Sequence, residues 1–275
     1  MPPAAGSGLL SLKITVLGSG TSHGVPSIGC DCAVCRSTDV RDRRSRPSIL
    51  VEIEHQAGTP FAEAVRSILV DTSTDLRAQA LAHDVRRVDA ILCTHSPADH
   101  VFGLDDVRRY NQMQKETIPC YADAETLANL RRMFAYIFEP ARQKGGGIPQ
   151  LAPFRIGGPF TLGGVEVVPV PLWHGRLPVL GFRIGSFAYL TDCNRIPDGS
   201  WALLDGVRTV ILDALRHRPH PTHFSVAESV EVVARLGAER AYFTHICHDL
   251  PHAETSAGLP AGVELAYDGL VVEIH

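Results

Sequence analysis

Short runs of apolar and β-branched residues recur along the chain, and several of them end at a glycine, aspartate or histidine. Runs of this length predict buried β-strands rather than helices. The predicted strands lie at 12–20, 48–54, 67–71, 88–94, 118–122, 165–172, 180–185, 187–192, 209–214, 240–245 and 270–274. The pattern therefore predicts a chain in which strands dominate.

Helical spacing of apolar residues is confined to fewer segments. Ser225 precedes an apolar stripe with Glu228 three residues further on, which is the pattern of a capping box, and Gly237 is the expected end of that helix. Two other amphipathic helices are expected on the same grounds. They lie at 73–84 and 123–139.

The glycine-rich stretch at 143–149 divides the chain into two strand-rich halves. Candidate ligands for metal occur on both sides of it, and neither half has an obvious full set. We therefore expect one domain, residues 11–275, with sheets inside and helices outside and a site between the halves. Residues 1–10 are expected to form a flexible N-terminal tail.

The charge and hydropathy of the chain argue against nucleic-acid and membrane partners. A net charge of −4 gives no general attraction to nucleic acid or acidic lipid. The chain has no run of about 18 apolar residues and no signal-peptide pattern at its start. We expect a cytoplasmic protein with no membrane and no stable nucleic-acid partner. The basic run 41–46 is expected to be a solvated loop, with a phosphate-binding patch as the alternative.

Polar side chains of metal-ligand type follow several predicted strands. The group after the strand at 88–94 indicates either a metal-binding loop or a polar loop whose aspartate caps a helix. It consists of His95, Asp99 and His100. The same position after an apolar strand is held by His174, Asp192 and His245. This repetition is hard to explain by packing and favours a hydrolytic metal centre, for which Zn²⁺ and Mn²⁺ are equally suited.

Three of the seven cysteines crowd into the segment GCDCAVC, at Cys30, Cys32 and Cys35. In a cytoplasmic chain, the spacing C-x-C-x-x-C indicates a metal site rather than disulfides. Three reduced thiols on a loop are the alternative.

The order of TH-x-x-x-DH, WHG, TD and FTH resembles the metallo-β-lactamase superfamily. More narrowly, GSGTSHGVPSIGCDCAVC, VFGLDDVRRYN, HPTHFS, FTHICHD and AYDGLVVEI resemble the PhnP-like phosphodiesterases associated with carbon-phosphorus lyase. This likeness extends from Leu12 to Ile274. It implies an α/β fold of the αββα sandwich type, with two mixed sheets flanked by helices, and a homodimer.

The same resemblance implies a function. The expected reaction is hydrolysis of a small-molecule phosphodiester, such as a cyclic phosphate or a nucleotide-like ester, to a phosphomonoester by metal-bound hydroxide. Asp99, which lies near that hydroxide, and His223, which would face the substrate phosphate, are the implied catalytic residues. The active-site ions would be Mn²⁺ or Zn²⁺.

The ligands implied by the resemblance fall into three sets. One ion would take His95, the side chain at position 97 and His174, and the other would take Asp99, His100 and His245, with Asp192 bridging both. A separate structural Zn²⁺ would be held by Cys30, Cys32, Cys35 and His248.

Position 97 is a proline, where the H-x-H-x-D-H motif of the family has a histidine. Proline has no side-chain donor atom, so it cannot be a ligand, and the first ion should be bound weakly. We expect hydrolysis weakened at that ion. The alternatives are a non-catalytic or one-metal protein that binds nucleotide or phosphate, and a tRNA 3′-processing-like or other hydrolase of this fold.

Four further polar residues lie outside these ligand sets. Asp213 ends a predicted strand and is expected to orient a histidine from behind. His217 and His220 are expected at the surface. For His23, the sequence does not decide between supporting the site and packing within its loop.

Overall fold

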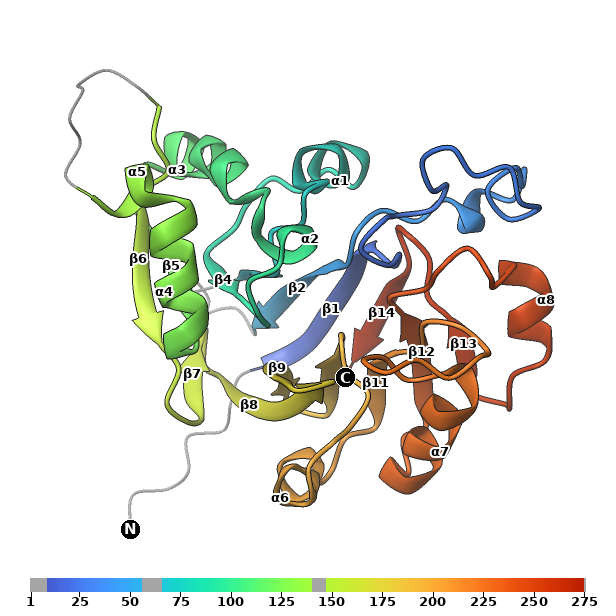
Figure 1. Cartoon of the computed structure of the whole chain (residues 1–275). Helices are drawn as coiled ribbons and strands as arrows, with labels where there is room; N and C mark the ends of the chain where they lie inside the picture. The colour runs from blue at the N-terminus through green and yellow to red at the C-terminus, as the bar shows by residue number, and fades with distance from the viewer. Residues whose placement is uncertain (1–8, 56–65, 140–146, 275) are drawn as a thin grey trace, which may run out of the picture.

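Two mixed sheets of seven strands pack face to face, with helices on both outer faces (Figure 1). The computed structural model describes residues 9–55, 66–139 and 147–274. The strand order is β14-β1-β2-β3-β4-β5-β6 in the first sheet and β13-β12-β11-β10-β9-β8-β7 in the second. The expected αββα sandwich is confirmed.

Each sheet is antiparallel on one side and parallel on the other. The strands of the first sheet are β1 (Leu9–Gly18), β2 (Ser48–His55), β3 (Ser67–Val70), β4 (Ala90–Leu92), β5 (Ile118–Ala122), β6 (Leu151–Arg155) and β14 (Val271–Ile274). Those of the second are β7 (Phe160–Leu162), β8 (Val165–His174), β9 (Leu177–Ile184), β10 (Phe187–Leu190), β11 (Thr209–Asp213), β12 (Arg240–Thr244) and β13 (Val263–Leu265).

Helices cover the outer face of each sheet. The first sheet is covered by α1 (Leu76–Ala82), α2 (Ala98–Val101), α3 (Arg108–Gln114), α4 (Ala124–Met133) and α5 (Ala135–Phe138). The second is covered by α6 (Asp198–Trp201), α7 (Val226–Leu236) and α8 (His252–Ala257). Three single turns are η1 (Val40–Asp42), η2 (Leu104–Val107) and η3 (Ala202–Leu204). In the described ranges, no helix has the length and apolar character needed to cross a membrane.

The strands read as continuous apolar runs because both of their faces are buried. On β2, Ile49 and Val51 pack between the sheets, whereas Leu50 packs under the helices of the first sheet. On β10, Tyr189 faces the inter-sheet core and Leu190 faces the helices of the second sheet. Successive strand residues point to opposite faces, so a strand covered on both sides needs apolar residues throughout.

The parallel strands bring their carboxyl ends to one edge of the sandwich. In the first sheet, Asp71 follows β3 and His95 follows β4. In the second, Asp192 follows β10, Asp213 ends β11 and His245 follows β12. Ligand sites of open α/β sheets lie at such carboxyl ends, so the fold places the candidate residues where a site is expected.

The structure differs from the sequence-based prediction at several elements. Three short strands, β6, β7 and β13, were not predicted. The predicted helix 123–139 is broken at Phe134, whose φ of −116° and ψ of 43° end α4 before α5 begins. Strand β1 starts at Leu9, two residues inside the predicted tail. Residues 1–8 and most of the glycine-rich stretch lie outside the described residues.

The helix after Ser225 forms as predicted. The Ser225 side chain accepts from the Glu228 amide, the Glu228 side chain accepts from the Ser225 amide, and both bonds of the capping box are present. Gly237 ends the helix with φ of 66°, a conformation that favours glycine.

Candidate metal centre

Asp192 lies at the centre of a cluster of imidazoles contributed by both sheets. Its Oδ1 lies 3.3 Å from His100 Nε2 and 3.3 Å from His245 Nε2, and its Oδ2 lies 3.7 Å from His95 Nε2. All of these side chains are buried. A single carboxylate therefore faces histidines from two separate segments, one after β4 and one after β12, as a bridging ligand would.

Asp99 joins this cluster from α2. Its Oδ2 lies 3.4 Å from His100 Nε2 and 3.9 Å from His245 Nε2. The ligand atoms of Asp99, His100, Asp192 and His245 all lie within 4.8 Å of one another. This is the complete ligand set that the resemblance implied for one of the two ions, and the structure assembles it in one place.

A second position adjoins the first and shares Asp192. His174, at the end of β8, is half-buried, and its ring centroid lies 5.9 Å from that of His95. This position is lined by His174, Asp192 and His223. Each of these residues places one ligand atom within 4.8 Å of the ligand atoms of the other two. The structure therefore brings all six predicted active-site ligands together, with His223 beside them.

The cluster fits divalent cations. Among the described residues, Nε2 of His95, His100 and His245 is buried with no hydrogen-bond partner. Leaving a buried polar atom unsatisfied costs about 1–3 kcal/mol, so three such atoms around one carboxylate are an arrangement that a metal ion would relieve. Imidazole nitrogens together with carboxylate oxygens suit Zn²⁺ and Mn²⁺.

The pKa shifts of two ligands, Asp192 and His95, suit metal binding. Burial alone would raise the pKa of Asp192, but the facing rings of His245 and His100 outweigh it and hold that pKa well below its usual range. Burial, aided by the neighbouring His100, holds the pKa of His95 well below its usual range. An ionised carboxylate beside a neutral imidazole is the form that binds a cation. Burial would lower the pKa of a third ligand, His100, but the facing carboxylates of Asp192 and Asp71 outweigh it and raise that pKa well above its usual range, so His100 has to lose a proton when an ion binds.

Asp71 supports the cluster from behind, and the sequence analysis missed it. His100 Nδ1 donates to Asp71 Oδ2 at 2.7 Å, while the backbone and hydroxyl of Thr94 donate to the same carboxylate at 2.8 Å. Such a bond fixes the ring so that Nε2 faces the ion. The signal was present, because Asp71 ends the run SILVD just as Asp192 ends FAYLTD.

Replacing Asp71 with asparagine should lower the affinity for the active-site ions about 10- to 100-fold. Asparagine tolerates the left-handed backbone of this position, where φ is 62°, but it loses the charge that orients His100. The measurement is a calorimetric metal titration. The control is Asp75→Asn, at a carboxylate that pairs instead with Arg46. Equal affinity in both variants would contradict the supporting role.

His223 and His174 are oriented in the same way. His223 Nδ1 donates to Asp213 Oδ2 at 2.7 Å, which confirms that Asp213 orients a histidine, and His174 Nδ1 donates to the Thr222 carbonyl at 2.9 Å. The His223 ring stacks on that of His245, with 4.5 Å between centroids. In both histidines Nε2 is left as the atom available to the site.

Three residues of the site edge adopt the left-handed backbone region without being glycine. The φ values are 62° for Asp71, 52° for Asp192 and 60° for His245. This region is unfavourable for residues with a Cβ, and such strain is concentrated at functional sites. Here it turns each side chain out of its strand and toward the shared edge.

Pro97 leaves the loop in place while contributing no ligand atom. It is the exposed N-cap of α2, with φ of −63° and ψ of 162°, and its carbonyl accepts from the His100 amide at 3.0 Å. The Thr74 hydroxyl donates to the next carbonyl, that of Ala98, at 2.9 Å. His100 is thus held in position despite the proline.

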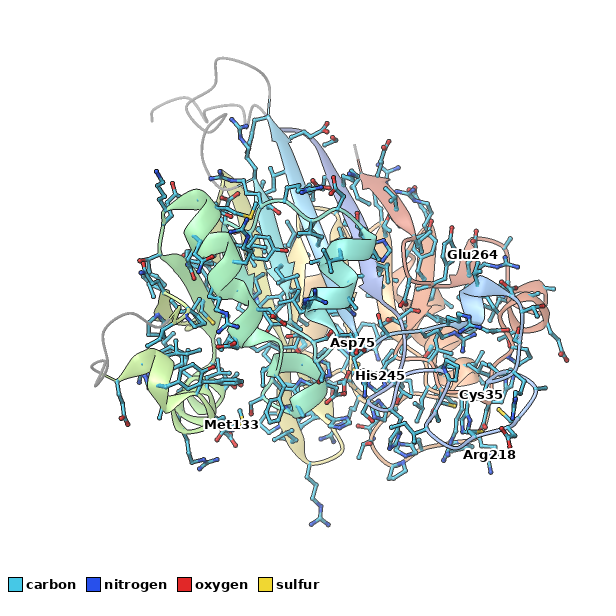
Figure 2. All side chains as sticks on the ribbon, turned by 90° about the horizontal axis from the view of Figure 1, so that it is seen from above. Cys35, Asp75, Met133, Arg218, His245 and Glu264 are labelled. Carbon is cyan, nitrogen blue, oxygen red and sulfur yellow. The ribbon has the colours of Figure 1, made fainter. Side chains whose placement is uncertain are left out.

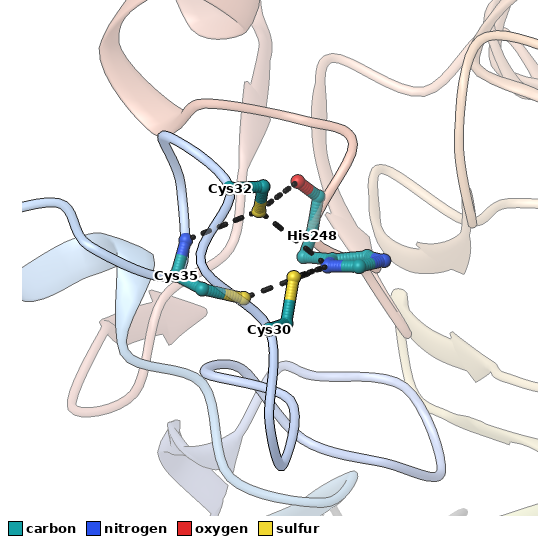
Figure 3. Close-up of side chains that lie close together, drawn as sticks. All are labelled: Cys30, Cys32, Cys35 and His248. Atoms are coloured by element: carbon teal, nitrogen blue, oxygen red, sulfur yellow. Dashed lines mark hydrogen bonds between the residues drawn. The ribbon is translucent and has the colours of Figure 1, made fainter.

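A second cluster lies beside this edge, between the loop after β1 and the loop after β12. The sulfurs of Cys30, Cys32 and Cys35 converge on His248, with distances to Nδ1 of 3.2, 3.5 and 3.5 Å (Figure 3). The structure brings together the four residues that the resemblance implied. Figure 2 shows Cys35 and His245 in the same part of the molecule.

The chemistry of the cysteine cluster fits a closed tetrahedral Zn²⁺ site. The Cys35 amide donates to Cys32 Sγ at 3.4 Å, and this bond, the largest of the influences on the thiol, lowers the pKa of Cys32 to about 7. The Ser27 amide donates to Cys35 Sγ at 3.3 Å. Burial nevertheless raises the pKa of Cys35 to about 11. Thiolate is the form that binds zinc, so the surrounding amides prepare Cys32, whereas Cys35 has to lose its proton when the ion binds.

Arg44 reinforces the junction between these two loops. Its side chain is fully buried, donates to the carbonyls of Cys247 and Leu250 at 3.0 and 2.7 Å, and pairs with Asp42 at 2.9 Å. The prediction of a solvated loop for the run 41–46 is therefore wrong at this residue. The guanidinium of Arg44 contacts backbone carbonyls of a distant loop, and no local sequence pattern indicates such a contact.

Comparisons with known proteins agree with this geometry. A family model described as a beta-lactamase superfamily domain matches residues 66–246. The crystal structure of a diphosphatase from the PhnP family is 45% identical, covers 97% of this chain and 98% of its own, and superposes with a TM-score of 0.86. The expected likeness to PhnP-like proteins is thereby confirmed.

Two further relatives add to this picture. An octanoyltransferase of Porphyromonas gingivalis (strain ATCC BAA-308 / W83) is 35% identical over 94% of this chain, although the chain spans only about half, 51%, of that protein. Zn²⁺-bound PqqB from Methylobacterium extorquens is 20% identical, covers 94% of this chain and 99% of its own, and has a TM-score of 0.74, which shows the fold alone. The family match, the sandwich and the cluster at its edge lead to one conclusion: this chain belongs to the metallo-β-lactamase superfamily.

Proposed function

We propose that this protein is a metal-dependent hydrolase that cleaves a small-molecule phosphodiester to a phosphomonoester. The observation that carries the proposal is the buried set of unpartnered imidazole nitrogens around Asp192. Two adjacent ion positions that share one carboxylate suit a displacement at phosphorus, in which charge develops on both the attacking and the leaving oxygen.

In this proposal, each residue of the site has its own role. Divalent ions held there would supply Lewis acidity and a water of lowered pKa. Asp192 links both ion positions, and Asp99 lines the side nearest His100. His223 keeps Nε2 free because Nδ1 is engaged by Asp213. That nitrogen contacts a phosphoryl oxygen and exchanges a proton with the leaving oxygen.

Hydrolysis of a diphosphate is a second candidate, since the 45%-identical relative is a diphosphatase. Both reactions displace a bridging oxygen from phosphorus, so the same ligands serve either one. Octanoyl transfer is not part of this proposal, because the chain spans about half of the octanoyltransferase it resembles.

The test is turnover of bis(p-nitrophenyl) phosphate by protein loaded with Mn²⁺ or Zn²⁺, with a simple diphosphate ester assayed in parallel. We expect release of nitrophenol that depends on added metal. Asp192→Asn should reduce kcat/KM at least about 100-fold, because it weakens both ion positions at once.

Asp198→Asn is the matched control, since Asp198 is an exposed carboxylate six residues away on α6. It should retain full activity. A metal-loaded protein that binds nucleotide monophosphates but hydrolyses no phosphodiester and no diphosphate would instead identify a non-catalytic binding protein.

A further inference from the structure

A group of three ligands adjoins the complete ligand set around His100 and shares only Asp192 with it. Its members are His174, Asp192 and His223, whose ligand atoms lie within 4.8 Å of one another. The His174 ring centroid lies 4.6 Å from that of His223 but 5.9 Å from that of His95. Among the described residues, His95 belongs to no group of three ligand atoms that lie this close together. The ligand position beside His174 therefore forms a tighter set with His223 than with His95.

The ring of His223 is oriented as the ring of a metal ligand is. Its Nδ1 donates to Oδ2 of the fully buried Asp213 at 2.7 Å. The same distance joins His100 Nδ1 to Asp71 Oδ2 behind the complete ligand set. A carboxylate at Nδ1 fixes the tautomer in which Nε2 carries a lone pair, and histidines that bind metal usually have such a partner. His223 therefore offers an acceptor nitrogen at an ion position to which Pro97 contributes none.

The side-chain amide of Asn194 holds the loops of these three ligands together. Its Oδ1 accepts from the Gly175 amide and its Nδ2 donates to the Pro221 carbonyl, each at 2.9 Å. These contacts lie next to the ligands: Gly175 follows His174, Asn194 lies two residues after Asp192, and Pro221 lies two residues before His223. One side chain thus fixes the spacing of all three loops, so the fold itself preforms the group.

We propose that His223 takes the place of the ligand missing at position 97, so that a divalent ion binds between His174, Asp192 and His223. The set has only three protein ligands, and it shares one of them with the neighbouring ion. Binding should therefore be weak enough for exhaustive dialysis to reverse it. Imidazole suits Zn²⁺, whereas carboxylate suits Mn²⁺, so this pair of histidines with a shared aspartate selects Zn²⁺ over Mn²⁺.

This ligand set has a consequence for turnover, because one nitrogen cannot bind an ion and exchange a proton at the same time. The consequence rests on the proposed function, in which His223 Nε2 acts on the leaving oxygen, whereas the ligand set does not rest on it. Excess metal should inhibit the native protein by occupying that nitrogen. In Pro97→His, the new imidazole supplies the ligand and leaves His223 free, so the same excess should not inhibit.

The test is a titration with Co²⁺, which takes the ligands of Zn²⁺ and reports them through its visible absorption. Native protein that carries only its dialysis-resistant ions should bind one further Co²⁺ per chain. His223→Asn keeps an amide where Nδ1 donates to Asp213 but removes Nε2. Its affinity for the further ion should fall about 100-fold, since even a residue behind a ligand contributes about 10- to 100-fold.

His220→Asn is the matched control. The His220 ring lies 5.2 Å from that of His223, but His220 belongs to none of the ligand groups in the described part of the chain. It is half-buried rather than exposed as the sequence suggested. This variant should bind the further ion as tightly as the native protein does.

Turnover of bis(p-nitrophenyl) phosphate at increasing Co²⁺ gives a second readout. In the native protein, kcat/KM should fall about 100-fold over the concentrations at which the further ion binds, and in Pro97→His it should not fall. Equal affinity for that ion in native protein and His223→Asn, or no further ion in the native protein, would overturn the inference. An ion lost only in His223→Asn, with no turnover of any ester, would support the ligand set while overturning the proposed function.

Discussion

Replacing Pro97 with histidine should raise kcat/KM for phosphodiester hydrolysis about 100-fold, which corresponds to about 3 kcal/mol of transition-state stabilisation. Proline offers no donor atom, so the ion that we propose beside His95 and His174 would lack one ligand. The substitution supplies an imidazole at that position. The exposed Pro97 side chain and its φ of −63° and ψ of 162° are compatible with histidine, so no rearrangement of the loop is needed.

The matched control is Pro197→His. Pro197 is the N-cap of α6 with φ of −59° and ψ of 151°, nearly the backbone of Pro97, but it belongs to a helix that holds no metal ligand of the described cluster. It should leave turnover unchanged. A Pro97→His protein that binds no additional ion and gains no activity would show that the site does not need a ligand at position 97. That result would also show that weak binding of the first ion does not limit turnover.

Replacing Cys32 with serine should remove the zinc from the cysteine cluster and destabilise the whole edge of the sandwich. Zinc binding contributes about 10–16 kcal/mol to the folding of small zinc peptides. In a domain with its own core, we expect a smaller loss of unfolding free energy, on the order of 3–5 kcal/mol. The measurements are thermal unfolding and zinc content.

Cys247→Ser is the control for this loss. Cys247 is adjacent to His248 but is not among the four residues that converge in the cluster. Cys247→Ser makes the same exchange of sulfur for oxygen on the loop after β12, which carries His248, and this variant should retain its zinc. A Cys32→Ser protein with unchanged zinc content and thermal midpoint would show that the three thiols do not hold a metal.

Much of the fold was predictable because burial on both faces makes the central strands plainly apolar. The strands that were not predicted are short and lie at or near sheet edges. Strand β6, for example, includes Pro153 and is partly exposed, so its sequence lacks a clear apolar run. The break at Phe134 was missed because the apolar spacing continues through it, and only its backbone angles show the end of α4.

The candidate site was predictable to a different degree. Its ligands were identified because each follows a strand and because their order resembles a known family. Asp71 could have been found by the same strand-end rule. Arg44 could not, because its partners are carbonyls about two hundred residues away in the chain.

The central claim is that the edge of the sandwich holds one complete ion site, one incomplete site beside it and one zinc site built from cysteines. Metal content per chain, measured by elemental analysis after exhaustive dialysis against metal-free buffer, tests it most directly. The account predicts two retained ions in the native protein, three in Pro97→His and one in Cys32→Ser. Three ions retained by the native protein, or none beyond the zinc of the cysteine cluster, would contradict it.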